Sequence, residues 1–191
     1  MECKSLVLDP IVSWWESNGI IHLTIIFNEV LKEPWIDRLG QPIPGKKIIL
    51  IQERAESILL SPDFKTDKPA VYEIAILKDL FDSAFDSRRL STKEIVDKAL
   101  LLGFNFLDPE VACISREKIS HKDLLSIGLD SLIFVHKPIN DSMGNPSLLT
   151  LNQGNHYDGA YHDMLGASDY EPCGRWLACT NFAFLVSKTY L

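Results

Sequence analysis

Residues 91–128 hold three helix-start signals in succession, and this run constrains the fold more than any other feature of the chain. Ser91 stands three residues before Glu94, the spacing of a capping box, in which each side chain bonds the backbone N–H of the other residue. Apolar residues at helical spacing follow, and Gly103 stands where a left-handed residue commonly ends a helix. The pattern predicts a helix over residues 91–102.

Two further helices are expected directly after the first. The sequence DPE at residues 108–110 combines a capping residue, a proline and an acidic first turn, so it predicts a helix that continues to about Lys118. Ser120 and Asp123 repeat the spacing of a cap. They predict a third helical turn that ends near Gly128.

Nucleic acid is an unfavourable partner for this chain. The formal net charge of −7 and the pI near 5.2 repel phosphate groups unless a local basic patch overrides them. The first two predicted helices could be taken for a helix-turn-helix with Arg88 and Arg89 on phosphates. The second helix would then present Asp108 and Glu110 to the most negative part of the DNA. We therefore expect an ordinary packed pair of helices and no nucleic-acid binding.

The pattern changes from helices to strands after residue 128. The runs "DSLIFVHKPI" and "SLLTL" consist of apolar, β-branched and aromatic residues, and "NDSMGNP" between them holds residues that favour turns. These runs predict two antiparallel strands joined by a long hairpin loop. The run "NFAFLVS" predicts a last strand.

The first half of the chain also contains strand signals. Residues 20–28 alternate apolar and polar positions and are rich in β-branched residues, which favours a half-buried strand, with a helix through the same segment as the alternative. The run "KKIILIQ" predicts a buried strand. The run "AVYEIAILKDLFDSAF" could begin as a strand and become a helix. Asp9, before Pro10, and Gly19, as a stop, predict a short helix across Pro10–Ser17.

Helices followed by strands predict an α+β fold. We expect the helices to pack on one side of an antiparallel sheet, and the C-terminal strands to form a three-stranded meander. A chain of 191 residues, 46% of them hydrophobic, can bury a core as a single domain, 1–191. A possible division places an N-terminal lobe at 1–87 and a C-terminal lobe at 88–191.

The expected compartment is the cytoplasm. The N-terminal segment lacks the charged and apolar regions of a secretory signal. The most hydrophobic segment, "GIIHLTIIF", is far shorter than the ~20 apolar residues of a membrane span, so no membrane is expected. The four cysteines have no C-x-x-C spacing and indicate reduced thiols, with Cys113 as a small core residue. Secretion without a cleavable signal stays open.

The second half of the chain carries a distinctive order of segments. "LLGFNFLDPEVACISRE" is followed by "HKPINDSMGNPSLLTL", by a loop that bears Gly, Asp and His, and then by Trp176 and "FAFLVS". This order resembles a scattered group of uncharacterised bacterial proteins, in which a Pro-Ile strand end meets an Asp-Ser-x-Gly-x-Pro turn. The resemblance implies a bacterial origin. It brings no activity and assigns no functional residue.

Two histidines, each followed closely by an aspartate, stand in "NHYDGAYHD". On an extended backbone His156, Asp158 and His162 share one side, so they could supply three ligands of a zinc-type site with Asp163 as a base. The helical H-E-x-x-H spacing of established zinc enzymes is absent. Three glycines within 154–166 favour an irregular surface loop between two strands. We therefore expect no cofactor, with zinc or another divalent metal as the alternative.

Cys173, between a proline and a glycine, is the thiol expected to be exposed. With His156 or His162 as base and Asp158 or Asp163 as the orienting carboxylate, it could form a Cys-His-Asp nucleophile activated by Arg175. The members of such triads come from separate elements, whereas these lie within one short segment. Asp163 and Cys173 are the candidate catalytic residues.

The sequence contains no dinucleotide-binding, Walker A, nucleophile-elbow or kinase motif. The leading expectation is a non-enzymatic bacterial protein-binding module that contacts its partner through loops 140–146 and 152–176. Aromatic residues in the second loop match the composition of contact surfaces: Tyr157, Tyr161, Tyr170 and Trp176. The alternative is a metal-dependent hydrolase with a His/Asp site in the 154–170 loop. Neither the partner nor the oligomeric state is predicted.

Overall fold

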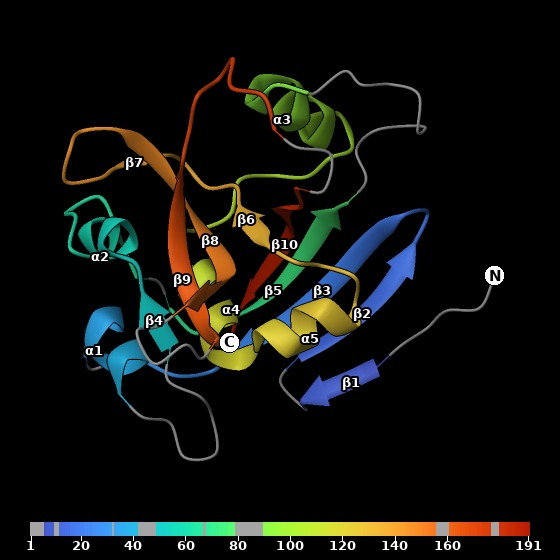
Figure 1. Cartoon of the computed structure of the whole chain (residues 1–191). Helices are drawn as coiled ribbons and strands as arrows, with labels where there is room; N and C mark the ends of the chain where they lie inside the picture. The colour runs from blue at the N-terminus through green and yellow to red at the C-terminus, as the bar shows by residue number, and fades with distance from the viewer. Residues whose placement is uncertain are drawn as a thin grey trace.

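The computed structural model describes residues 6–9, 12–31, 33–41, 49–66, 68–78, 90–155, 161–176 and 180–191. Its strands are β1 (Leu6–Asp9), β2 (Val12–Ser17), β3 (Ile20–Phe27), β4 (Ile49–Ile51), β5 (Ala70–Leu77), β6 (Leu132–Phe134), β7 (Ile139–Asn140), β8 (Pro146–Asn155), β9 (Tyr161–Asp169) and β10 (Phe182–Tyr190). Its helices are α1 (Trp35–Gly40), α2 (Glu53–Leu59), α3 (Thr92–Leu101), α4 (Glu110–Lys118) and α5 (His121–Ser126) (Figure 1).

The ten strands of the described residues belong to one mixed sheet. Their order is β1-β2-β3-β5-β10-β6-β8-β9-β4, and β7 pairs with β8 beside this path. Neighbouring strands are antiparallel except for β10 with β6 and β4 with β9, which are parallel. The prediction of an antiparallel sheet is therefore wrong. The reason is that β10 returns to the middle of the sheet, so strands from both halves of the chain lie side by side.

The two faces of the sheet carry two separate cores. In β6, Leu132 and Phe134 belong to the first core and Ile133 to the second; in β10, Ala183 belongs to the first and Phe182 to the second. Helices α1, α2, α4 and α5 pack into the first core, whereas α3 packs into the second, apart from the other four (Figure 1). The prediction of helices on one side only is wrong, because central strands that are apolar on both faces need cover on both.

The C-terminal strands do not form a three-stranded meander. The predicted antiparallel pairing of the two strands after residue 128 is confirmed by β6 and β8. Strand β8 then continues into a hairpin with β9, in which Ser147 faces Asp169 and Asn155 faces Tyr161. Strand β10 pairs with β5 and β6 instead of β9. Much of the segment 152–176, expected as a loop, is therefore strand.

Two glycines of this hairpin serve close packing. A Cβ atom on Gly166 would lie 2.9 Å from Oγ1 of Thr150 and 3.1 Å from Oε1 of Gln52. A Cβ atom on Gly154 would lie 2.9 Å from Sδ of Met164. Glycine within a strand often marks such a close approach of neighbouring groups. These two glycines therefore do not support the irregular loop that their presence predicted.

The three helices predicted after residue 90 are confirmed. Helix α3 begins with the capping box of Ser91 and Glu94, and Gly103 beyond its end has φ +85°. Helix α5 begins with a second capping box, formed by Ser120 and Asp123. The expected packing of the first two helices against each other is wrong, since α3 and α4 contribute to cores on opposite faces of the sheet.

A β-hairpin stands where a helix across Pro10–Ser17 was expected, and in its described part that prediction is wrong. Asn18 and Gly19 have φ values of +53° and +75°, and they form the two-residue turn between β2 and β3. Positive φ at both positions is the signature of a type I′ turn, for which Asn-Gly is the preferred pair. The hairpin places the rings of Trp15 and His22 in a stack with centroids 5.0 Å apart.

The strand predicted over residues 20–28 is confirmed as β3, whose buried residues alternate with half-buried ones. The run "KKIILIQ" supplies β4 in its described part. The run that follows residue 69 begins as β5, and its continuation from residue 79 lies outside the described residues. None of the helices in the described ranges has the length and apolarity needed to cross a membrane.

Helix α4 is buried from Glu110 to Glu117 and brings charged groups into the interior. The Nε1 atom of Trp35 donates a hydrogen bond to Oε1 of Glu110 at 2.9 Å, and Nε of Arg38 donates to Oε1 of Glu117 at 2.6 Å. Buried carboxylates are costly unless they are bonded in this way. Helix α1 therefore supplies the partners that keep α4, and the segment leading into it, in place.

Candidate functional site

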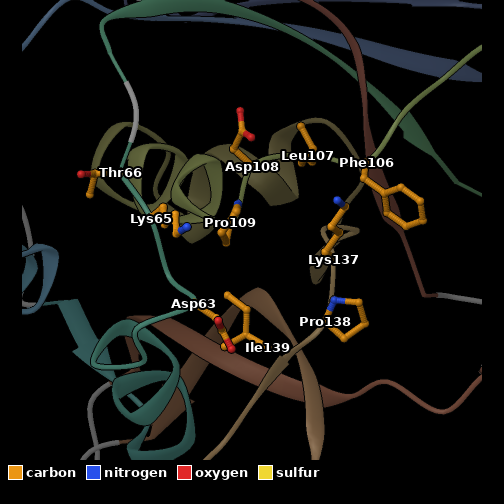
Figure 2. Close-up of a pocket in the computed structure, with 10 residues that line it drawn as sticks. All are labelled: Asp63, Lys65, Thr66, Phe106, Leu107, Asp108, Pro109, Lys137, Pro138 and Ile139. Atoms are coloured by element: carbon orange, nitrogen blue, oxygen red, sulfur yellow. The ribbon is translucent and has the colours of Figure 1, made fainter.

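An open cleft lies where three chain segments meet beside the start of α4 (Figure 2). Its volume is about 730 Å³, a size typical of ligand sites. Residues 63–66 follow α2, residues 106–109 precede α4, and residues 137–139 connect β6 to β7. The lining residues are Asp63, Lys65, Thr66, Phe106, Leu107, Asp108, Pro109, Lys137, Pro138 and Ile139.

His136 fixes the wall formed by residues 137–139. Its fully buried ring has Nδ1 2.8 Å from the carbonyl oxygen of Lys137, and Nε2 accepts a hydrogen bond from the N–H of Leu149 at 3.0 Å. These two contacts define a neutral ring with its proton on Nδ1. Burial lowers the pKa of His136 to about 4, against the opposing effect of the Lys137 carbonyl. The ring therefore supports the cleft backbone as a neutral group.

The other two walls are also attached to the body of the protein. The N–H of Leu107 donates a hydrogen bond to the carbonyl of Val135 at 2.9 Å, which joins the segment 106–109 to the end of β6. Phe64 packs against the first core, and its N–H donates to the carbonyl of Ser61 at 3.0 Å. The cleft is thus formed by fixed backbone.

Asp108 is neutralised from within the protein. Its Oδ2 atom lies 2.7 Å from Nζ of Lys188, and this ammonium lies 5.1 Å from the ring centroid of Tyr72 and 4.9 Å from that of Tyr190. Burial raises the pKa of Tyr72 to about 12, and the nearby Lys188 opposes that rise. Figure 2 shows the carboxylate of Asp108 directed away from Ile139. This aspartate, whose side chain is 41% exposed, is therefore paired with Lys188.

The two lysines of the cleft are available to a ligand. Lys65 and Lys137 are both exposed, and within the described residues neither forms an ion pair. They lie on opposite walls of the cleft (Figure 2). Asp63 is the remaining charged residue of the lining. When Asp108 is not counted because of its ion pair with Lys188, two lysines and one aspartate remain in the lining. Positive charge then exceeds negative charge.

The lining combines charged and apolar side chains. Among its ten residues there is no serine, cysteine or histidine, and Thr66 supplies the lone side-chain hydroxyl. The apolar surface of Phe106, Pro138 and Ile139 suits an apolar part of a ligand.

The sequence-predicted Asp163 lies away from this cleft, on β9. Its Oδ1 atom accepts a hydrogen bond from the N–H of His121 at 2.7 Å, and its Oδ2 atom lies 3.6 Å from Nη2 of Arg116. The side chain of Arg116 is fully buried. Burial lowers the pKa of Arg116, and the charge of Asp163 opposes that change. The carboxylate thereby joins α4 and α5 to the sheet.

The predicted metal ligands are only partly described. His162 precedes Asp163 on β9, and successive residues of a strand point to opposite faces, so these two side chains diverge. His156 and Asp158 lie outside the described residues. In the part of the chain that the structure describes, no three His, Cys, Asp or Glu side chains come together to hold a metal. The site of His156, Asp158 and His162 stays a prediction.

Cys173 is an exposed free thiol in the turn after β9. The backbone N–H groups of Thr92 and Lys93 donate hydrogen bonds to the carbonyls of Gly174 and Pro172, each at 3.0 Å. The turn is thereby bound to the start of α3. Its catalytic role stays a prediction.

The predicted contact aromatics have different positions. Trp176 and Tyr170 are half-buried and pack against the second core, where the ring of Trp176 meets that of Phe182 edge to face at 5.3 Å. Tyr161 is the first residue of β9, and Tyr157 lies outside the described residues. Because Trp176 and Tyr170 are only half-buried, part of each residue stays exposed to a partner.

The predicted contact loop 140–146 is a compact turn. Oδ2 of Asp141 accepts a hydrogen bond from Nε of Arg54 at 2.6 Å, and Oδ1 accepts from the N–H groups of Met143 and Asn145, each at 2.9 Å. The hydrogen bond from Arg54 holds the pKa of Asp141 below its usual value. Met143 stands at the tip, 83% exposed. The turn begins directly after Ile139 of the cleft.

The cleft residues Lys65 and Lys137 do not follow from sequence reasoning, because the three segments are distant in the chain. One available signal was the pair of Asp-Pro at 108–109 and Lys-Pro at 137–138, since proline stiffens an exposed connection. Comparison with protein-family models, curated proteins and solved structures gives no match. The resemblance to uncharacterised bacterial proteins therefore stays an expectation, and the roles of these residues rest on their geometry.

Proposed function

We propose that the protein is a non-enzymatic binding module of the bacterial cytoplasm, and that it binds a protein partner at the cleft and the adjoining turn 140–146. The observation that carries the proposal is the cleft itself, which combines apolar walls with two lysines that form no ion pair in the described residues. Its lining contains no serine, cysteine or histidine to act as a nucleophile or as its base. The exposed thiol of Cys173 and the buried thiol of Cys113 agree with a reducing compartment.

The rigidity of the turn 140–146 supports its part in the contact. The side chain of Asp141 bonds Arg54 and two backbone N–H groups, and the N–H of Ser142 donates to Oγ of Ser57 at 3.1 Å. A surface held in place before binding loses less conformational entropy when the partner arrives. Met143 at its tip offers an exposed, adaptable apolar side chain, a type enriched at protein interfaces.

A two-hybrid screen against bacterial genomic fragments tests the proposal. We expect the variant K65E/K137E to lose the partners that the native chain selects, because it reverses both free charges in the cleft. The matched control is K98E/K122E, which makes the same change at two exposed lysines outside the cleft. Met143→Asp should weaken the same interactions. Partners that bind K65E/K137E as well as they bind the control would refute the proposal.

A further inference from the structure

The charges around the cleft point to the sign of its ligand. Lys65 and Lys137 stand on opposite walls (Figure 2), and Asp108 is held by Lys188 at 2.7 Å. Asp63 is the carboxylate left in the lining, so the unpaired lysines outnumber it. The ammonium group of each lysine can donate charge-assisted hydrogen bonds to a carboxylate.

The apolar part of the lining lies next to these charges. Pro138 and Ile139 follow Lys137 on one wall, and Phe106 belongs to the segment 106–109 (Figure 2). A ligand that carried only charge would leave this surface without a partner. The lining therefore matches a group that presents a carboxylate and an apolar side chain close together, as adjacent residues of a peptide do.

The negative charge of the whole chain does not exclude such a ligand. The net charge of −7 is spread over the molecule, whereas the two lysines stand at the contact itself. At physiological ionic strength the charges are screened beyond about 8 Å, so nearby groups dominate the interaction. Remote acidic residues reduce the association rate more than they change the bound complex.

We infer that the cleft receives an acidic segment of the protein partner, in which a Glu or Asp side chain lies between Lys65 and Lys137 and a neighbouring apolar side chain lies against Phe106, Pro138 and Ile139. This inference rests on the proposed function and adds the chemistry of the partner. The cleft backbone is already fixed on each wall by the bonds of Leu107, Phe64 and His136.

Panning a phage-displayed random dodecapeptide library on the full chain tests the inference. We expect the selected peptides to be enriched in Glu or Asp next to an apolar residue. A synthetic copy of the best peptide should bind K65Q/K137Q about tenfold more weakly than the native chain, from two exposed charge contacts. It should bind the control K98Q/K122Q with native affinity. Replacement of its acidic residues by Gln or Asn should weaken binding to the native chain similarly.

Three results would overturn the inference. The first is a selection without acidic enrichment, and the second is a peptide whose affinity is unchanged in K65Q/K137Q. The third is competition by free glutarate or inorganic phosphate at the concentration at which the peptide itself competes, which would assign the cleft to small anions. If K65E/K137E loses its two-hybrid partners while the peptides fail these criteria, the proposed function stands without the acidic segment. If those partners persist, the proposed function itself fails.

Discussion

His136 makes the stability of the protein depend on pH in a way that can be calculated from its surroundings. The buried ring has a pKa of about 4, compared with 6.5 for an ordinary histidine. At a pH between these values, His136 binds a proton in the unfolded chain but not in the folded one. Its contribution to the free energy of unfolding is therefore fully present above about pH 6.5 and is lost as the pH falls toward 4. The full loss is about 3 kcal/mol, because each unit of difference between the folded and unfolded pKa corresponds to about 1.36 kcal/mol.

Substitution of His136 by Gln isolates this contribution. Gln lacks the titration, but it can still accept from the N–H of Leu149 and donate to the carbonyl of Lys137. Other acidic groups titrate equally in both proteins and cancel in the difference. The stability advantage of the native chain over H136Q should therefore shrink by about 2.5 kcal/mol between about pH 7.5 and about pH 4.5.

Urea unfolding followed by tryptophan fluorescence measures this difference, since the chain has four tryptophans. Lys137→Gln is the matched control, because it changes the next residue without removing the imidazole. It should retain the native dependence on pH. A difference between native chain and H136Q that is the same at both pH values would refute the assignment of a neutral, buried ring.

Three further predictions concern stability and are measured by the same urea unfolding. Gly166→Ala should cost about 1–3 kcal/mol, because its Cβ would lie 2.9 Å from Oγ1 of Thr150; native stability would contradict the tight packing of β8 and β9. Ser91→Ala should cost about 1 kcal/mol by removing the cap of α3, and a change below a few tenths would show that the capping box is not formed. Trp35→Phe should cost about 2 kcal/mol, because it removes a donor to the buried carboxylate of Glu110; an unchanged midpoint would mean that this bond contributes nothing.

The parts of the fold that follow from the sequence are those with local signals. The capping boxes at Ser91 and Ser120 place two helices because cap, first turn and apolar spacing lie within one short segment. The turn at Asn18-Gly19 is equally local. The prediction of a helix that stops at Gly19 is wrong because this pair prefers a two-residue hairpin turn.

The remainder of the fold depends on contacts that no local pattern records. Gly166 is a glycine because Thr150 and Gln52 approach it, and neither neighbour is close to it in sequence. The position of β10 between β5 and β6 likewise depends on pairing across the sheet. Local signals do not predict the cleft either, because Lys65 and Lys137 come to line one cavity only after the sheet has formed.

The place of β10 has a consequence for biosynthesis. During translation β5 leaves the ribosome first, and β10 follows more than a hundred residues later. The two strands nevertheless pair along their length, from Phe182 with Leu77 to Tyr190 with Ala70. Until then β5 has β3 on one edge and bare hydrogen-bonding groups on the other, a template for aggregation. Because such distant pairing is slow to form, a nascent chain should depend on chaperones until residue 190 has left the exit tunnel.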